Sequence, residues 1–261
     1  MPYTLSHAAV VLPFARPLAR WRLLSAVVIG SMVPDFGLFT PWRPGRFETH
    51  SAMALLTFCL PVGLASYWVF QHLIKTPVIE LLPDGAYARW QPFAAPANLG
   101  SIRQWILAAC GVLAGAVTHL ILDGFTHQGA RGVRMIPALD DSIAEIGGHH
   151  LVAFRLLQDG ISLIGLAVVI GIACYALRRG AIQPAATRTL RTSERRAWAL
   201  AYTAAAVALG AASFFRMHFA MHHSHSVTAN ANYAAVASLH GLAGALLGVS
   251  LCLKWRLRAD R

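Results

Sequence analysis

The chain of 261 residues is 56% hydrophobic and only 13% charged, and its mean hydropathy is +0.53. This composition excludes an ordinary soluble domain and indicates a protein that is embedded in a lipid bilayer. The formal net charge of +11 is not accompanied by a recognisable nucleic-acid-binding module. We therefore expect the arginines to contact anionic headgroups of membrane lipid, and we expect no nucleic-acid partner.

Apolar stretches long enough for a membrane span, at about 20 residues, recur along the chain. The first two candidates, residues 4–21 and 23–39, are the weakest because prolines and charged residues interrupt them. Five stronger candidates follow at residues 52–74, 105–122, 161–177, 197–215 and 233–253. The pattern predicts an all-α protein, a polytopic transmembrane helical bundle with six to seven membrane elements.

Basic residues are concentrated in the connection that follows residue 177 and at the end of the chain. Cytoplasmic loops of membrane proteins carry an excess of lysine and arginine, so both places should be cytoplasmic. We therefore expect a multi-pass protein of the inner (plasma) membrane with a cytoplasmic C-terminus. The same pattern divides the chain into a membrane domain over residues 1–180, and a basic loop with a C-terminal transmembrane hairpin over residues 181–261.

Three polar residues at regular spacing mark the end of the helix predicted over residues 105–122: His119, Asp123 and His127. Side chains four residues apart share one face of a helix, and imidazole with carboxylate is a typical ligand set for zinc or a similar divalent metal. Ionisable groups are costly in a membrane unless they have partners. The face therefore predicts a metal site. The alternative is a polar seam in which the histidines bond to Asp123 and to carbonyls of neighbouring helices.

The predicted orientation brings further candidate ligands to the same side of the membrane. With the arginine-rich connection inside, the end of the helix that carries Asp123 faces outside, and Asp35 and His50 lie on that side too. His7 joins them if residues 4–21 also cross the membrane. This is a reason to prefer seven membrane elements to six.

Five short motifs occur in a fixed order: MPYTLSH at residues 1–7, GSMVPD at 30–35, THS at 49–51, GAVTH at 115–119 and FTH at 125–127. Together they resemble a group of bacterial integral membrane proteins, the domain of unknown function 4184 family. The resemblance spans most of the first 180 residues. It implies a membrane protein and carries no established activity.

A more distant likeness is to membrane-bound metal-dependent hydrolases and, more faintly, to zinc-dependent phospholipase C. It rests on the order His, Pro-Asp, His and His-x-x-x-Asp, and it implies a multinuclear zinc centre that hydrolyses a phosphodiester. The implied catalytic residues are Asp35 and Asp123, with Asp35 bridging two metals or acting as the base. The metal ligands that it implies are His7, Asp35, His50, His119 and Asp123, with His127 as a less regular member.

The chain departs from the phospholipase pattern in one respect, because Glu145 precedes His149 where the pattern has a His-x-x-x-Glu pair. The number of metal ions therefore stays open. Beyond the metal ligands, Arg131 and Arg134 follow His127 in the same outer loop, where they could hold a phosphate group.

These patterns together predict a membrane-embedded metal-dependent hydrolase that acts on a phosphoester or lipid-linked substrate at the extracytoplasmic face, with zinc as the expected metal. One alternative is a non-enzymatic metal carrier or sensor that uses the histidine-rich stretch 218–225 as an entry site. A carrier needs polar residues in the cytoplasmic halves of the spans, and apart from His72 the sequence offers almost none. The other alternative is a structural scaffold with a polar helix seam.

Overall fold

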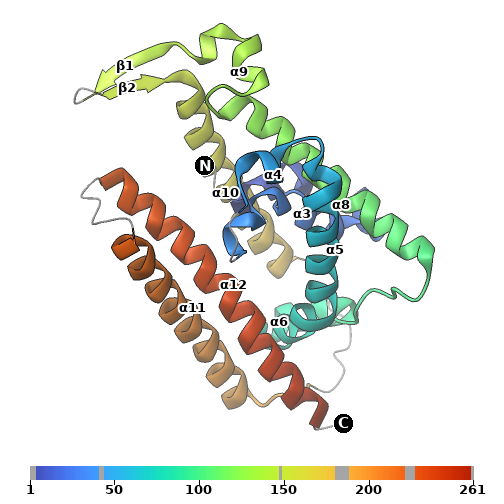
Figure 1. Ribbon diagram of the computed structural model, residues 1–261. Coiled ribbons are helices and arrows are strands. Elements are labelled where there is room, and N and C mark those ends of the chain that lie inside the picture. The colour runs from blue at the N-terminus through green and yellow to red at the C-terminus, as the bar shows by residue number, and fades with distance from the viewer. Residues whose placement is uncertain (1–3, 41–43, 147–148, 180–187, 221–226, 260–261) are drawn as a thin grey trace. The chain divides into compact units, whose positions relative to one another are not determined.

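The computed structural model of the protein describes residues 4–40, 44–146, 149–179, 188–220 and 227–259. Nearly all of these residues are helical (Figure 1). Turns and loops connect the helices, and the described strands form one short antiparallel hairpin of β1 (Ser142–Ile146) and β2 (His149–Val152). The predicted all-α class is confirmed.

Within the described ranges, five helices are long and apolar enough to cross a membrane. Each one corresponds to one of the five stronger stretches predicted from hydropathy: the first begins three residues after its predicted start, and the other four cover their stretches completely. The first, Leu55–Leu81, is built from the consecutive segments η4 (Leu55–Cys59), α5 (Leu60–Val69), η5 (Phe70–Ile74) and α6 (Lys75–Leu81). The other four spans lie in α8 (Ile102–Thr126), α10 (Ala153–Arg178), α11 (Thr192–Ala220) and α12 (Val227–Ala259).

The N-terminal region differs from a pair of full-length spans, because its helices are short. One arm consists of η1 (Thr4–His7), α1 (Ala8–Val11), η2 (Leu12–Phe14) and α2 (Ala15–Arg20). The return arm consists of α3 (Leu24–Gly30) and η3 (Val33–Phe39). Between them Arg22 adopts a left-handed conformation with φ of 58°. Five of the expected six to seven membrane elements therefore have the length of a span.

The remaining described elements are short and connect the longer helices. They are α4 (Arg46–His50), α7 (Asp84–Trp90), η6 (Gln91–Phe93), α9 (Arg131–Met135) and η7 (Pro137–Leu139).

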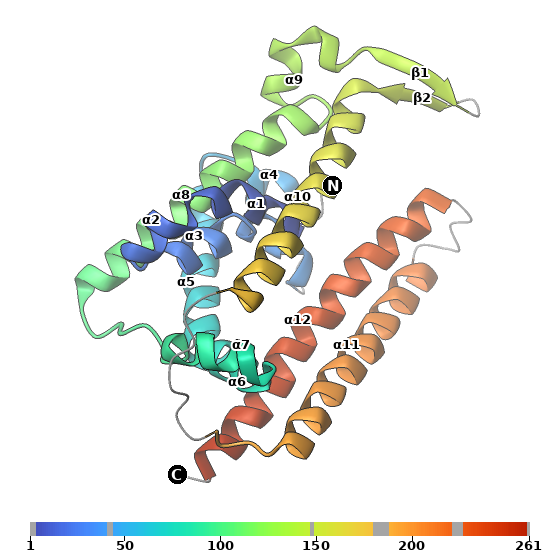
Figure 2. The same cartoon turned by 180° about the vertical axis from the view of Figure 1, so that it is seen from behind.

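The chain packs as two compact units. The first contains Met1–Tyr67 and Asn98–Ala176, and the second contains Trp68–Ala97 and Leu177–Arg261. In the second unit, α11 and α12 form a helical hairpin (Figure 2), in which Ser213 Oγ and His240 Nδ1 lie 2.6 Å apart. The proposed division of the chain at residue 180 stays a prediction. All the metal ligands predicted from the sequence lie in the first unit.

In the first unit, α3 packs directly against α8 through small residues. A Cβ atom on Gly30 would overlap the carbonyl group of Val112, and a Cβ atom on Gly115 would overlap the Val27 carbonyl and lie 2.5 Å from Ser31 N. The two backbones therefore touch at these glycines, because no side chain separates them there. Such contacts are common between membrane helices. This contact sets Ser31, at the end of α3, beside the face of α8 that carries His119.

We expect Gly115→Ala to destabilise the first unit, because the added methyl group forces α3 away from α8. Overpacking of this kind costs about 1–3 kcal/mol. Gly124→Ala is the matched control on the same helix, because nothing lies within 4 Å of its added Cβ. The measurement is the thermal unfolding midpoint in detergent. Equal midpoints for the two variants would contradict the role given to the α3–α8 contact.

Candidate metal centre

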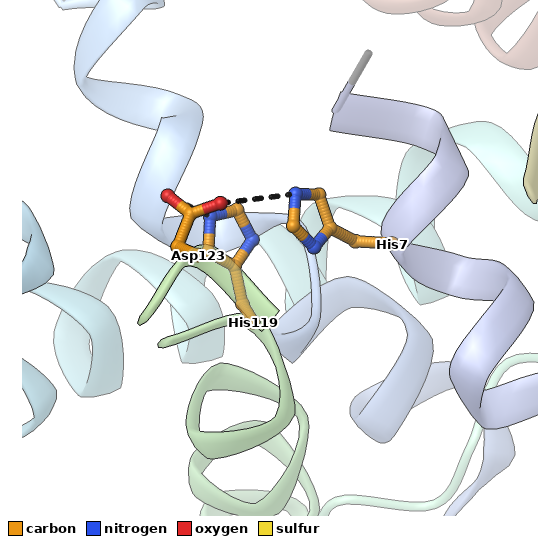
Figure 3. Close-up of side chains that lie close together, drawn as sticks. All are labelled: His7, His119 and Asp123. Atoms are coloured by element: carbon orange, nitrogen blue, oxygen red, sulfur yellow. Dashed lines mark ion pairs between the residues drawn. The ribbon is translucent and has the colours of Figure 1, made fainter. Parts of the chain in front are cut away.

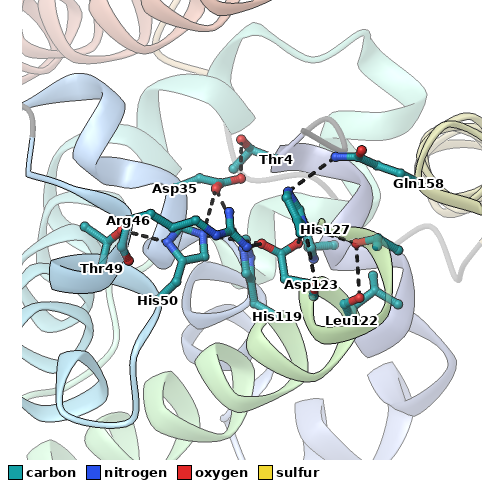
Figure 4. Close-up of polar contacts among 12 residues, drawn as sticks. Thr4, Asp35, Arg46, Thr49, His50, His119, Leu122, Asp123, His127 and Gln158 are labelled. Carbon is teal, nitrogen blue, oxygen red and sulfur yellow. Dashed lines mark hydrogen bonds and ion pairs between the residues drawn. The ribbon is translucent and has the colours of Figure 1, made fainter. Parts of the chain in front are cut away.

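Five ionisable side chains from four separate segments meet in the first unit (Figures 3 and 4). The histidines and aspartates are contributed by η1, η3, α4 and α8, and they are His7, Asp35, His50, His119 and Asp123. Four of them are almost completely buried: His7 is 1% exposed, His119 0%, and Asp35 and Asp123 4% each. The tertiary structure thus brings together residues that are up to 116 positions apart in the sequence, from His7 to Asp123.

The imidazoles face the two carboxylates at similar distances. His50 Nε2 lies 3.4 Å from Asp35 Oδ1 and 3.5 Å from Asp123 Oδ2. His119 Nε2 lies 3.7 Å from each of the same two oxygens. On the other side of Asp123, His7 Nε2 lies 3.7 Å from Oδ1 (Figure 3).

These contacts define two overlapping groups of three candidate ligands. His7, His119 and Asp123 form one group, and Asp35, His50 and His119 form the other; in each group the ligand atoms lie within 4.8 Å of one another. Asp123 presents Oδ1 to His7 and Oδ2 to His50 and His119. His119 belongs to both groups, and the bridging position expected for Asp35 stays a prediction.

Contacts on the outer sides of these residues orient them. His119 Nδ1 donates a hydrogen bond of 2.8 Å to the backbone carbonyl of Ser31, which can only accept, so Nε2 of a neutral ring carries the free lone pair. The Thr4 hydroxyl donates to Asp35 Oδ2 at 2.8 Å. His50 Nδ1 lies 2.7 Å from Thr49 Oγ1 (Figure 4). A hydrogen bond from the ring nitrogen that points away from the metal is typical of metal-binding histidines.

Five buried polar atoms of the cluster have no hydrogen-bond partner among the described residues. They are both ring nitrogens of His7, Nε2 of His50, Nε2 of His119 and Oδ1 of Asp123. Buried polar atoms are normally hydrogen-bonded, and leaving one unpaired costs free energy. Two ligand atoms about 2.05 Å from a tetrahedral zinc ion lie about 3.3 Å apart. The nitrogen-to-oxygen distances of 3.4–3.7 Å are close to that value, so the residues fit a divalent cation.

Arg46 is the one cationic side chain bonded to the cluster within the described residues, and its Nη2 donates a 2.7 Å bond to Asp123 Oδ2. With neutral histidines, the two carboxylates and this guanidinium leave a net charge of −1. A buried site with negative net charge attracts a cation, and the low dielectric constant around it strengthens that attraction.

His127 lies at the edge of the cluster and belongs to neither group. Its Nδ1 is 3.3 Å from the Asp123 carbonyl oxygen and 3.5 Å from Asp123 Oδ1, and its Nε2 is 3.3 Å from Gln158 Nε2. Burial lowers the pKa of His127, and Arg46 lowers it further, although Asp123 acts in the opposite direction. A neutral ring that accepts from Gln158 carries its proton on Nδ1, next to Asp123. This arrangement suits a side chain that orients Asp123.

The two arginines expected to bind substrate, Arg131 and Arg134, are exposed residues of α9. Within the described chain their side chains have no hydrogen bond or ion pair, and their predicted role stays a prediction. Arg46 has the contact with Asp123 instead, and sequence reasoning missed it. The spacing of Arg46 and His50, four residues apart on α4, is a signal that the sequence contains. The contacts of Thr4 and Ser31 are tertiary and have no such signal.

The proposed entry stretch of the alternative metal carrier falls mostly on residues 221–226, which lie outside the described residues. His218 is the only histidine of that stretch in the described part of the chain.

Comparisons with known proteins give one match. A family model described as "Domain of unknown function (DUF4184)" matches residues 1–252, which include every residue of the cluster. The chain matches neither a curated protein nor a solved structure. The more distant likeness to metal-dependent hydrolases therefore has no support from these comparisons. The family expected from the short motifs is confirmed and extends well beyond the first 180 residues: the chain belongs to the DUF4184 family, a family of unknown function.

Proposed function

We propose that this protein is a membrane-embedded hydrolase that depends on a divalent metal, with zinc as the best candidate, and acts on a phosphoester or lipid-linked substrate. The observation that carries the proposal is the convergence of two carboxylates with three imidazoles, whose Nε2 atoms form no hydrogen bond with the described residues. A cation is the simplest common partner for these atoms. Imidazole with carboxylate favours zinc or another divalent first-row metal.

His7, His50, His119, Asp35 and Asp123 would hold the metal. When bound, it would supply a Lewis acid that polarises the phosphoryl oxygen and lowers the pKa of water. Ser31 keeps the lone pair of His119 directed inward, and Asp123 faces His7 through Oδ1 and His119 through Oδ2. In the proposed reaction a water oxygen attacks phosphorus while the bond to the leaving oxygen breaks. Asp35, where it serves as the base instead of a ligand, takes up the proton of the water and passes it to the leaving oxygen.

The distances favour this proposal over a polar seam. A seam would be held by direct hydrogen bonds of about 2.7–3.2 Å between histidine and carboxylate. Thr4 and Arg46 make bonds of that length to the two aspartates, at 2.8 and 2.7 Å. The imidazoles that face the same aspartates stay at 3.4–3.7 Å, where an intervening cation is the better explanation.

The membrane arrangement is part of the same proposal. Five spans and the two shorter arms formed by residues 4–39 would together make seven membrane elements, in the inner membrane, with the C-terminus in the cytoplasm. Asp123 lies in the last turn of α8, a helix of spanning length, so the site would lie near one surface of the bilayer. The arginine-rich connection on the cytoplasmic side puts that surface outside. A lipid headgroup would reach the site there.

We expect purified protein to retain at least one zinc ion per chain after dialysis, and the double variant His119→Ala, Asp123→Ala to retain none. His72→Ala is the matched control, because His72 belongs to the second unit and to neither ligand group. Elemental analysis gives the metal content. A wild type without metal would refute the proposal, and variants that lose folding yield without any change in bound metal would favour the seam.

We expect the zinc-loaded protein to hydrolyse bis(p-nitrophenyl) phosphate and Asp35→Asn to lose about 100-fold or more of that rate, the range for removal of a general base. The measurement is nitrophenolate release in detergent, with His72→Ala as the control. Metal content is measured on the same samples, because Asp35 is also a proposed ligand. Full activity in Asp35→Asn would exclude Asp35 as the base.

The predicted topology has a separate test. A fluorescent protein of the kind that matures only in the cytoplasm, fused after Arg261, should fluoresce, and alkaline phosphatase fused at the same place should be inactive. The reverse pair of results would put the C-terminus outside and move the metal cluster to the cytoplasmic surface.

A further inference from the structure

Arg46, which is bonded to Asp123 of the cluster, carries a permanent charge and is more exposed than the cluster residues. Its side chain is 47% exposed, whereas the side chain of Asp123, to which it is bonded, is 5% exposed. The guanidinium thus extends from solvent to the buried carboxylate. His50 and His127, with side chains 9% and 17% exposed, are the next most accessible members. A molecule that approaches the buried ligands from solvent therefore meets Arg46 first.

Most of the hydrogen-bonding capacity of Arg46 is unused. A guanidinium carries five N–H donors in a planar fork. Among the described residues, Arg46 makes one hydrogen bond, from Nη2 to Asp123 Oδ2. The remaining donors are in the geometry that binds two oxygens of one phosphate or carboxylate group.

The net charge of the site also favours an anionic ligand. Without a metal, the two aspartates and Arg46 sum to −1 with neutral histidines, and one divalent cation would change this to +1. A site with positive net charge and an exposed guanidinium selects an anionic ligand over a neutral ester or amide. Arg46 and His50 share one face of α4, so the anion-binding group and a proposed metal ligand are held by the same short helix.

We propose that Arg46 is the anion-binding residue of this site and that the substrate is an anionic phosphate ester. The ester would be held by the guanidinium donors that Asp123 leaves free. This inference rests on the proposed function for the chemistry at the metal, and it narrows the substrate from a phosphoester or lipid-linked compound to an anionic phosphate ester that Arg46 binds. The inference also assigns to Arg46 the phosphate-binding role that the sequence suggested for Arg131 and Arg134.

The test is calorimetric titration with two probes, inorganic phosphate and dihexanoyl phosphatidylglycerol, on zinc-loaded and metal-free protein in detergent. Wild type, Arg46→Gln and Arg46→Lys are compared, and Arg155→Gln is the control, because Arg155 is exposed on α10 and has no polar contact within the described chain. We expect Arg46→Gln to weaken binding about tenfold or more, as loss of a charged hydrogen bond does. The affinity of Arg46→Lys should lie between those of wild type and Arg46→Gln, because lysine keeps the charge and lacks the planar fork of donors.

The outcomes separate the two proposals. Metal content unchanged in Arg46→Gln together with weaker phosphate binding supports the inference. Equal affinity of Arg46→Gln and wild type overturns it, as does a wild type that binds neither probe in either form. Loss of affinity in Arg131→Gln or Arg134→Gln instead of Arg46→Gln would return the role to the outer loop.

A wild type that holds no zinc but binds phosphate through Arg46 would refute the metal hydrolase and leave the anion site. Of the two probes, the one bound more tightly identifies the source as free phosphate or lipid headgroup.

Discussion

The burial of two carboxylates among apolar helices is the constraint on which the rest of the first unit depends. Asp35 and Asp123 are each 4% exposed. An ionised carboxylate in such surroundings is unstable unless charged or hydrogen-bonding groups surround it. Those groups come from segments that are remote in sequence, Thr4 for Asp35 and Arg46 for Asp123. The cluster and the fold of the unit therefore form together, because neither carboxylate has its partners until the N-terminal helices have packed.

Close backbone contacts allow the N-terminal helices to reach the cluster. Glycine on α3 and α8 lets the two helices touch, and this puts the Ser31 carbonyl within hydrogen-bonding distance of His119. The arm that begins with η1 packs against α10 just as closely. A Cβ atom on Gly165 would lie 2.9 Å from Ser6, the neighbour of His7. Short helices that could not cross a bilayer alone are thus held in the unit by packing against full-length spans.

The same cluster contains two kinds of contact, and the difference between them bears on its role. Direct hydrogen bonds of 2.7–2.8 Å hold the outer edges of the aspartates and histidines. The Nε2 atoms of His7, His50 and His119 lie 3.4–3.7 Å from the carboxylate oxygens and have no hydrogen-bond partner among the described residues. A cluster selected only for stability would close these inner distances, because each unpaired buried atom is costly. Rigid support on the outside with open donor atoms inside is the arrangement of a binding site.

The sequence by itself determined the helical class, the five spans, the family and the ligand face formed by His119 and Asp123. These properties follow from runs of apolar residues, short motifs and i, i+4 spacing, all of which are local. Only the tertiary structure decided that the N-terminal arms consist of short helices, that His127 turns towards Gln158, and that Arg46 reaches Asp123. Such contacts depend on how closely two backbones approach, and no periodicity within one segment reports the distance to another.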